Sequence, residues 1–576
     1  MDSPPSGDIA TKTSVSVLTA SLILGALFGL FVYPNWQVLL IPTKIMAGIV
    51  DFPGPNLPQY INMKSWNLLS QCLAPLMRHG WTDAQVSQLA SVVQGMAALG
   101  GLSLLALAVT RSPLLSVAVG PAFLYLGLWS GGVAYPIHLI GFHSYGVVGF
   151  DFALLTAGLF VTRLYTPAAF LAGLLPCIHP SWGVWICTTL GLYLLIHFRT
   201  IQNKAAILGC LGLGAAASVG SYLYQAQFIP DMTALSEGLR IPGLTDKQYF
   251  MAQLHSWAGQ HRSLGLWVYL HKGFAISLCG FLTSVLLLTS KRLNAGESLK
   301  RFAWFQAIFF SLTLCVSVFI TLLPDAAPSI LHVLMPNRFW CLSFVLTILT
   351  ALTVGFAALN SRFLSIFLIL AVGLLILQSH TKTHVMYFFL GPLMVLALAH
   401  RGTRPFASAP RLAAAASLLI YGAAAWAVLH IPLAAIHGQP LRYDGGNSIP
   451  MTPALEAVDR SGGTTALAPT VDYYLQMRLK APVVFSQEMV AASYAAEILP
   501  LIDKVAEDIH GEGFIRPYLE NRPPPDVWPN WTARSTQEWE TLMKKYGIDT
   551  IIVRREDSLN LPLLAEDEKY RVYKRP

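Results

Sequence analysis

The chain has 576 residues, of which 54% are hydrophobic and only 12% are charged, and its mean hydropathy is +0.54. Soluble domains carry about 25% charged residues, so this composition excludes an ordinary soluble protein and indicates a membrane protein. The 36 prolines and 44 glycines are too widely spread for a disordered chain and suit kinked membrane helices. The net charge is +8, but the position of the charges is more informative than their total.

Apolar runs of about 20 residues recur through the first three quarters of the chain and predict membrane-spanning helices. About thirteen spans are expected, at 14–34, 92–110, 113–130, 145–162, 166–178, 182–198, 205–224, 270–290, 302–323, 339–359, 363–378, 384–400 and 411–430. The fifth and sixth also fit one broken hairpin, because Pro176 and Pro180 lie between them. The predicted fold class is therefore mainly α, a polytopic helix bundle.

Basic residues gather in the short loops on one side of this bundle. The positive-inside rule makes that side cytoplasmic, so the N-terminus is expected in the cytoplasm and the chain after residue 430 outside it. The basic residues on this side are Lys12, Arg111, Arg163, Arg199, Lys204, Lys291, Arg292, Lys300, Arg301, Arg362, Arg401, Arg404 and Arg411. A signal peptide in place of the first span is a less favoured interpretation, since the apolar run is long and lacks a clear cleavage site.

Two long loops, 35–91 and 225–269, are expected on the outer side. Residues 59–78 carry Tyr60, Met63, Trp66, Leu69 and Leu73 at helical spacing. This spacing predicts one amphipathic helix that lies in the membrane interface.

The tail, 431–576, differs in composition from the membrane domain, 1–430. It carries 16 basic and 20 acidic residues, and four short β-prone runs and two helical segments predict a small α/β domain. The expected strands are 465–468, 482–485, 549–553 and 570–573, and the expected helices are 490–509 and 535–546. No catalytic motif is evident in the tail, so we expect a scaffold that packs on the outer loops.

Two carboxylates stand out among the ten in residues 1–430, seven of which fall on the outer side. Asp51 lies in the sequence IVDFPGP, where prolines and a glycine fix the backbone around one acid. A partly desolvated carboxylate of this kind is a candidate general base, although a loop aspartate also commonly caps a turn.

Asp151 lies about six residues into the fourth expected span, or roughly 9 Å below the membrane surface at ~1.5 Å per residue. An ionisable residue at that depth is a candidate functional group with a partner nearby. The expected partners are His138, His143 or His179, and a buried structural hydrogen bond is the competing interpretation.

The outer side also offers candidate substrate- and phosphate-binding residues. His179 lies in the sharp turn CIHPSWG, and His143 lies in a similar but weaker context. In the second outer loop and at the starts of two later spans, basic residues accompany tryptophan and tyrosine, which suits a phosphate and a sugar. These residues are His261, Arg262, Lys272 and Arg338, each of which is also explained as a solvated or membrane-anchoring side chain.

No metal site is predicted. His380 and His384 have the spacing of two ligands on one helical face, but no carboxylate is close in sequence. The seven cysteines include no CxxC pair and are typical of small core residues. No Gly-rich phosphate loop is present, and no nucleic-acid partner is expected.

The layout resembles the C-type (GT-C) superfamily of membrane glycosyltransferases. The features are many spans, an acid in the first outer loop, long amphipathic outer loops and an outer C-terminal domain. The span count is similar to that of oligosaccharyltransferase catalytic subunits. The sequences HPSWG at 179–183, KYGIDTIIV at 545–553 and YRVY at 570–573 resemble bacterial members. The Trp-Trp-Asp motif of oligosaccharyltransferases is missing, which argues against peptide glycosylation.

The resemblance implies a polyprenyl-phosphate-linked sugar as donor and a glycan, lipid or protein as acceptor, at the outer face of a bacterial cytoplasmic (inner) membrane with the tail periplasmic. It leaves a divalent cation, Mg²⁺ or Mn²⁺, open as a cofactor. By this resemblance Asp51 or Asp151 would be the base, and Arg338, Arg262 or Lys272 would neutralise the leaving phosphate. First-loop acids in this superfamily often come as a pair, whereas Asp51 has no acidic neighbour before Asp83.

Three other functions compete with this one. An O-antigen-type ligase or polymerase would also use outer histidines and arginines with a lipid-linked donor. A transporter or flippase predicts ionisable groups near the middle of the bilayer. A structural assembly subunit predicts outer acids and histidines that scatter around the rim.

Overall fold

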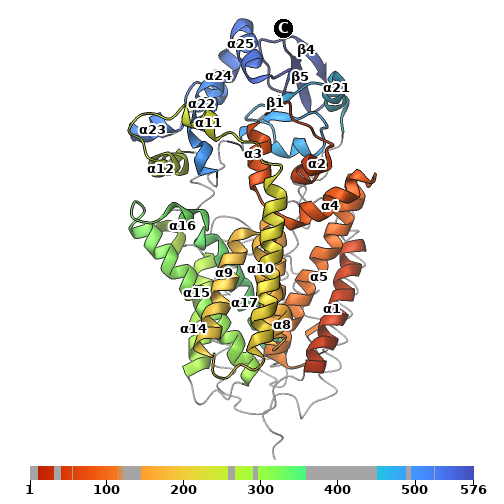
Figure 1. Ribbon diagram of the computed structural model, residues 1–576, viewed down its shortest axis with the longest axis vertical. Coiled ribbons are helices and arrows are strands. Elements are labelled where there is room, and N and C mark those ends of the chain that lie inside the picture. Colours follow the sequence, from red (N-terminus) through yellow and green to blue (C-terminus); the bar gives the residue numbers. More distant parts are fainter. Residues whose placement is uncertain are drawn as a thin grey trace, which may run out of the picture. The chain divides into compact units, whose positions relative to one another are not determined.

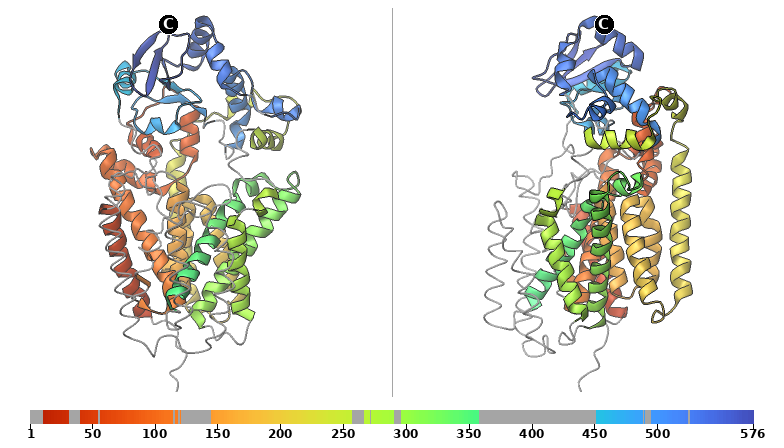
Figure 2. Two further views of the ribbon diagram at one scale, coloured as in Figure 1. Left: turned by 180° about the vertical axis from the view of Figure 1, so that it is seen from behind. Right: turned by 90° about the vertical axis from the view of Figure 1, so that its left-hand side faces the viewer.

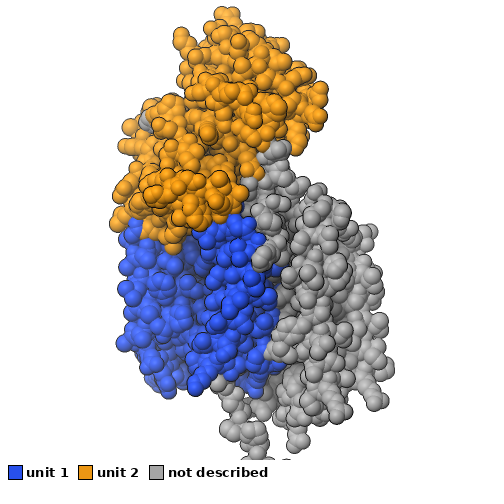
Figure 3. All heavy atoms as spheres, turned by 90° about the vertical axis from the view of Figure 1, so that its right-hand side faces the viewer, with its two compact units in different colours: residues 1–38, 87–220, 265–443 blue, residues 39–86, 221–264, 444–576 orange. Residues whose placement is uncertain are grey.

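The computed structural model describes residues 11–31, 40–54, 56–113, 116–117, 120, 145–256, 266–270, 272–289, 296–357, 451–487, 489, 495–523 and 526–576. The chain forms two compact units, each assembled from separate stretches of sequence (Figure 1, Figure 3). Unit 1 comprises residues 1–38, 87–220 and 265–443, and unit 2 comprises residues 39–86, 221–264 and 444–576.

Unit 1 is built from apolar helices, with α5 and α10 each having one end in unit 2. They are α1 (Thr11–Phe31), α5 (Asp83–Thr110), α7 (Tyr145–Val161), α8 (Tyr165–Ile178), α9 (Pro180–Ile196), α10 (Lys204–Ala226), α14 (Lys272–Thr289), α15 (Glu297–Leu322) and α17 (Pro336–Ala357). Two short elements, η1 (Leu266–Leu270) and α16 (Ser329–Val333), join them. Helices α14, α15 and α17 pack against one another, as do α7, α8 and α9 (Figure 2).

Four of these helices are long and apolar enough to cross a membrane, so the chain is a multi-pass membrane protein. They are Thr11–Leu30, Asp83–Thr110, Lys204–Ala226 and Glu297–Leu322, and the apolar helices of 10–17 residues are Gly146–Val161, Tyr165–Ile178, Pro180–Ile196 and Gly273–Thr289. The expected spans 363–378, 384–400 and 411–430, and most of 113–130, lie outside the described residues. The total of about thirteen spans and the orientation of the termini therefore stay predictions.

Helices α1 and α5 approach each other closely because glycine meets glycine. A Cβ atom on Gly25 would lie 2.3 Å from the carbonyl oxygen of Gly95, and one on Gly95 would lie 2.4 Å from that of Gly25. Small residues permit such close packing where hydrophobic burial gives no advantage over lipid.

Unit 2 combines the two long loops with the tail. The first loop forms α2 (Ile41–Ala47), α3 (Leu57–Lys64) and α4 (Leu68–Arg78), and the second forms α11 (Thr233–Glu237) and α12 (Asp246–Ser256). The tail helices are α21 (Pro453–Ser461), η3 (Tyr473–Met477), η5 (Ala496–Ile498), α22 (Leu499–His510), α23 (Ile515–Leu519), α24 (Trp528–Ala533) and α25 (Thr536–Tyr546). Helix α3 contacts β2 of the tail, and α11 and α12 contact α22.

The tail contains one five-stranded sheet of order β2-β1-β3-β5-β4. The strands are β1 (Thr465–Leu467), β2 (Val483–Phe485), β3 (Thr550–Arg554), β4 (Leu563–Glu566) and β5 (Tyr570–Lys574). β1 pairs in parallel with β2 and β3, whereas β5 pairs antiparallel with β3 and β4. The four strands expected from the sequence are confirmed. β4 was not expected, because this edge strand is largely exposed and lacks the alternation of a half-buried strand.

The expected single interface helix over 59–78 is wrong. The segment forms two helices, α3 and α4, and the apolar face is buried within unit 2, with Tyr60 4%, Met63 0% and Leu73 2% exposed. The break between them is held by the indole of Trp66, which donates to Ser221 Oγ at 3.0 Å. The position of the break between α3 and α4 therefore depends on contacts with residues about 150 positions away. The spacing of neighbouring residues cannot reveal such contacts.

Buried Gln225, which is 1% exposed, uses both ends of its amide. Its Nε2 donates to the Met63 and Ser65 carbonyls at 2.7 and 3.3 Å. Its Oε1 accepts from the Asn67 N–H at 3.2 Å and from Gln71 Nε2 at 2.9 Å. We call these five residues the Gln225 network, and it ties the first loop to the end of α10.

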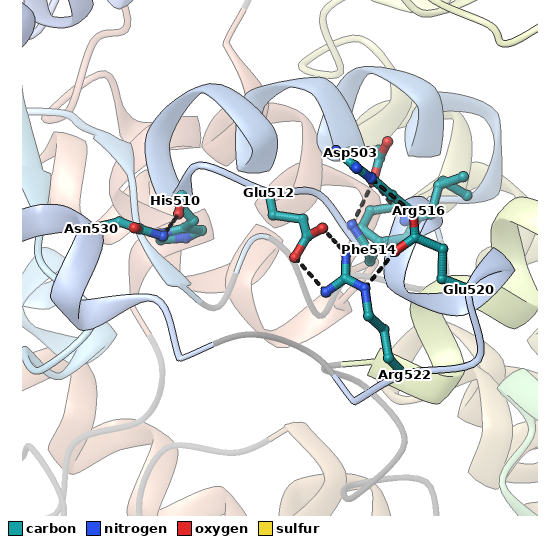
Figure 4. A network of polar contacts seen from close by, with 9 residues as sticks. Asp503, His510, Glu512, Phe514, Arg516, Glu520, Arg522 and Asn530 are labelled. Carbon is teal, nitrogen blue, oxygen red and sulfur yellow. Dashed lines mark hydrogen bonds and ion pairs between the residues drawn. The ribbon is translucent and has the colours of Figure 1, made fainter.

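A second polar network closes the turn after α22 in the tail (Figure 4). Asp503 Oδ1 accepts from the N–H groups of Phe514 and Ile515 at 2.6 and 3.0 Å. The Arg522 guanidinium donates to Glu512 through two nitrogens and to Glu520 Oε2 at 2.6 Å. These bonds fix the turn 511–514 against the start of α23.

Candidate functional site

Several of the residues singled out in the sequence are outside the described part of the chain, namely His138, His143, His261 and Arg262. Lys272 opens α14, but its side chain is also outside the described part. Asp51 belongs to unit 2, and Asp151, His179 and Arg338 belong to unit 1. The described candidates therefore fall into two groups, one in each unit.

Asp51 lies on an anchored loop of unit 2. Its neighbours Val50 and Phe52 are 2% and 8% exposed and belong to a hydrophobic cluster with Ile45 and Met46. The turn before it is set by Gly48, whose φ of 72° is left-handed. The Asp51 side chain itself is exposed, so it differs from the partly desolvated carboxylate that we expected. The loop therefore exposes one carboxylate to solvent, and the buried residues before and after it, Val50 and Phe52, fix its backbone.

A buried lysine lies close to this loop, and no pattern in the sequence predicts it. Lys44 is 4% exposed, and its Nζ lies 2.8 Å from Asp83 Oδ2 and donates to the carbonyl of Met477. Burial lowers the pKa of the neighbouring Arg478, and the Asp83 carboxylate opposes that shift. A buried cation is tolerated only when it is paired, so this cluster is one polar link between the first loop and the tail.

Helix α3 makes a further link to the tail through one carboxylate. Glu497 Oε1 accepts from Lys64 Nζ and from the Tyr60 hydroxyl, each at 2.5 Å. Burial alone would raise the pKa of Glu497, but the hydrogen bonds from Lys64 and Tyr60 lower it below its usual value. The Tyr473 hydroxyl also donates to Asn62 Oδ1 at 2.8 Å. The tail therefore acts as a scaffold for the loop that carries Asp51.

Asp151 lies in α7 of unit 1 and is fully buried, with 0% of its surface exposed. Within the described residues neither of its carboxylate oxygens makes a hydrogen bond of normal geometry. The polar side chain that acts on it is that of Gln94 in α5, which is 2% exposed. Asp151 is thus fully buried beside the amide of Gln94.

His179 occupies the sharp turn that the sequence predicts, between α8 and α9. Its backbone is extended, with φ −156° and ψ 110°, and its Nδ1 accepts from the N–H of Trp182 at 3.3 Å, so it is the N-cap of α9. The Trp182 indole donates to the Gly146 carbonyl at 2.9 Å. A Cβ atom on Gly149 would lie 2.5 Å from the Cβ of His179, so only glycine fits here.

The start of α17 packs on this turn. The ring of Phe339 lies edge-on to Trp182 at 4.4 Å and 6.2 Å from the His179 ring. The next residue back is Arg338, whose charge acts on His179. The structure therefore brings together two of the predicted residues, His179 and Arg338.

Asp151 is not part of this group. Gly149 contacts His179, and Asp151 follows two residues later, which in an α-helix is a rotation of about 200°. Its carboxylate accordingly faces Gln94 of α5. Of the three expected partners of Asp151, His179 does not act on it, and His138 and His143 lie outside the described residues. Gln94 could have been anticipated only from the packing of α5 on α7.

No group of three His, Cys, Asp or Glu side chains in the described part of the chain lies close enough to hold a metal ion. His380 and His384 lie outside that part. The described residues thus do not by themselves form a site for Mg²⁺ or Mn²⁺.

Comparison with known proteins gives remote likenesses to solved structures, of which two are described. One is ArnT from Cupriavidus metallidurans bound to undecaprenyl phosphate, with 12% identity, a TM-score of 0.40, and 98% of this chain and 99% of that chain covered. The other is the oligosaccharyltransferase of Archaeoglobus fulgidus in the apo form, with 12% identity, a TM-score of 0.42, and 94% and 69% covered. No protein-family model and no curated protein matches the sequence.

Proposed function

We propose that the protein is a membrane glycosyltransferase. It would move a sugar from a polyprenyl-phosphate-linked donor to a glycan, lipid or protein acceptor at the outer face of the membrane. The observation that carries the proposal is Asp51, an exposed carboxylate on a loop that is anchored by buried Val50 and Phe52. A general base must reach the hydroxyl that it deprotonates, and a fixed exposed carboxylate meets that need.

The proposed reaction is an inverting transfer. The Asp51 carboxylate takes the proton of the acceptor hydroxyl as its oxygen attacks the anomeric carbon. The bond from that carbon to the phosphate oxygen breaks, and the polyprenyl phosphate leaves with the electron pair. The acceptor gains the sugar, and the proton stays on Asp51 until solvent removes it.

The leaving phosphate needs positive charge, because electrostatic stabilisation usually lowers the barrier of such a reaction more than any other effect. Arg338, whose neighbour Phe339 lies 6.2 Å from the His179 ring, stays one candidate for this role. His143, His261, Arg262 and Lys272 stay further candidates. Asp151, being buried, is assigned a structural role with Gln94.

Release of free polyprenyl phosphate tests the proposal, because that product does not depend on the acceptor. Membranes with the full chain would be incubated with a panel of polyprenyl-phosphate sugars and a cell-envelope extract, and the lipid product measured by mass spectrometry. Undecaprenyl phosphate, the lipid in the ArnT structure, is the calibration standard. Asp51→Asn should abolish the release, whereas Asp325→Asn, which changes an exposed carboxylate in unit 1, should not. Equal release from wild type and Asp51→Asn would refute the assignment of the base.

One observation favours a second candidate function, a transporter or flippase of lipid-linked glycans. Asp151 is a buried ionisable residue inside a membrane helix, as expected for a group that lines a transport pathway. In proteoliposomes this function predicts movement of an intact lipid-linked sugar that depends on Asp151, without release of polyprenyl phosphate.

A further inference from the structure

A hollow of about 60 Å³ lies in unit 1 among helices α8, α9 and α10. Its lining is almost wholly apolar and consists of Phe160, Tyr165, Ala168, Ala169, Ala172, Cys187, Leu190, Gly191, Leu194, Ile207 and Leu211. These residues come from the end of α7, the start of α8, the second half of α9 and the start of α10. The hollow, which we call the α8–α10 groove, is therefore near one end of the bundle.

The floor of the groove is rigid. The Phe160 ring packs edge-on against Tyr193 at 4.7 Å and is tilted against Tyr165 at 5.5 Å. Ser218 of α10 also donates to the Gly173 carbonyl of α8 at 2.7 Å, which holds these two helices together. The space is thus set by helix packing and not by a loop.

Basic residues stand at this same end of the three helices that line the groove. Arg163 precedes α8, Arg199 follows α9, and Lys204 is the first residue of α10. Residues 152–230 contain no aspartate or glutamate at all. These three helices therefore contribute positive charge, and no negative charge, at this end of the groove.

We propose that the α8–α10 groove binds an anionic phospholipid, with part of an acyl chain in the groove and the phosphate among Arg163, Arg199 and Lys204. A basic pocket between membrane helices, next to an apolar slot, suits an amphiphile with a negatively charged head group. Each Lys or Arg near the head group contributes about fivefold in affinity, since about 1 kcal/mol corresponds to about that factor. The lining of the groove includes neither Asp51 nor Arg338, so this proposal does not depend on the proposed function.

Gly191 offers a substitution that fills the groove without straining the helix. A Cβ atom at Gly191 meets nothing within 4 Å, so Gly191→Leu would place its side chain in the empty space. Gly209 of α10 is the matched control, because its Cβ also meets nothing, it is exposed, and it does not line the groove. Both variants exchange glycine for leucine in a membrane helix, so any general effect on helix stability is shared.

The full chain would be purified, exchanged into mixed phosphatidylglycerol and phosphatidylethanolamine, and examined by native mass spectrometry. Wild type and Gly209→Leu should each keep one bound phosphatidylglycerol. The fraction of Gly191→Leu that keeps this lipid should be at least about tenfold lower than in wild type. Equal retention by Gly191→Leu and wild type would overturn the proposal.

A charge variant tests the other half of the site and does not alter packing in the groove. Arg163→Gln combined with Arg199→Gln should weaken the preference for phosphatidylglycerol by about 25-fold, two factors of about five. Lys12→Gln, at the start of α1, removes an exposed cation from a helix that does not line the groove, and it should leave the preference unchanged. If the wild type retained phosphatidylethanolamine as well as phosphatidylglycerol, or preferred a neutral isoprenoid lipid, the groove would not select an anionic lipid. Either result would refute the proposal.

Discussion

Asp51 and Asp151 lie in similar local sequences but in opposite environments. Each follows an apolar residue and precedes a phenylalanine, yet Asp51 is exposed on a loop of unit 2 and Asp151 is fully buried in a helix of unit 1. The flanking residues explain the difference. Pro53 and Gly54 prevent a helix after Asp51, whereas the residues around Asp151 continue α7 without a break.

The contrast extends to the buried polar groups of the two units. In unit 2 the Gln225 amide makes four hydrogen bonds, and Lys44 is paired with Asp83. In unit 1 the Asp151 carboxylate has Gln94 as its polar neighbour and no hydrogen bond of normal geometry within the described residues. A buried and satisfied group stabilises its surroundings, while a buried and poorly satisfied one costs stability.

The largest effect is expected from Asp51→Asn. An amide cannot accept the acceptor hydroxyl's proton, and loss of a general base costs about 10²–10⁴-fold in rate. The release of polyprenyl phosphate measures it, and the melting temperature should stay unchanged because the side chain is exposed. A loss of rate together with a large fall in melting temperature would mean that Asp51 is structural.

Gln225→Leu should destabilise the protein by about 3 kcal/mol. The substitution leaves buried donors and acceptors of the Gln225 network unpaired, at about 1–3 kcal/mol for each one that cannot reach water. Gln227→Leu is the matched control, since Gln227 is exposed two residues further on. Denaturant unfolding of the full chain in detergent gives the difference, and equal values for the two variants would show that the network contributes nothing.

The buried histidine of the tail predicts a dependence of stability on pH. Burial lowers the pKa of His510 to about 3, and Arg534 adds to that shift. The unfolded chain, with a histidine pKa of about 6.5, then binds the proton more tightly than the folded one. Stability from this group is complete above pH 6.5 and falls as the pH is lowered toward 3, by about 2–3 kcal/mol between pH 6.5 and pH 4.

The measurement is the melting temperature of the full chain against pH, in wild type and in His510→Gln. Trp531 donates to His510 Nδ1 at 3.0 Å, and a glutamine oxygen can accept that bond. The variant should therefore lose most of the slope between pH 4 and 6.5. An unchanged slope would assign the acid sensitivity to other groups.

The smallest effect is expected from Asp151→Leu. Apolar residues of similar volume often replace buried ionic groups without loss, so the free energy of unfolding should change by less than about 1 kcal/mol. Transfer should stay within about tenfold of wild type. A complete loss of transfer with normal stability would make Asp151 the base and reverse the contrast with Asp51.

Much of the architecture follows from local sequence, because apolar length sets the membrane helices and β-branched runs set four strands of the tail. The turn at His179 was also predictable, since Pro180 ends one helix and begins another. Contacts between distant residues were not predictable. The break between α3 and α4 depends on Ser221 and Gln225, the burial of Lys44 depends on Asp83 and Met477, and the partner of Asp151 depends on how α5 packs on α7.

Because unit 2 draws on three distant stretches of the chain, its assembly is tied to the timing of synthesis. The ion pair between Lys64 and Glu497 cannot form until Glu497 has been synthesised, 433 residues later. At about 5–20 residues per second this delay is roughly 20–90 s. Throughout that time α3 has been synthesised without the carboxylate that Tyr60 and Lys64 bind. The loop that forms α3 therefore lacks this contact with the tail until the ribosome has made Glu497.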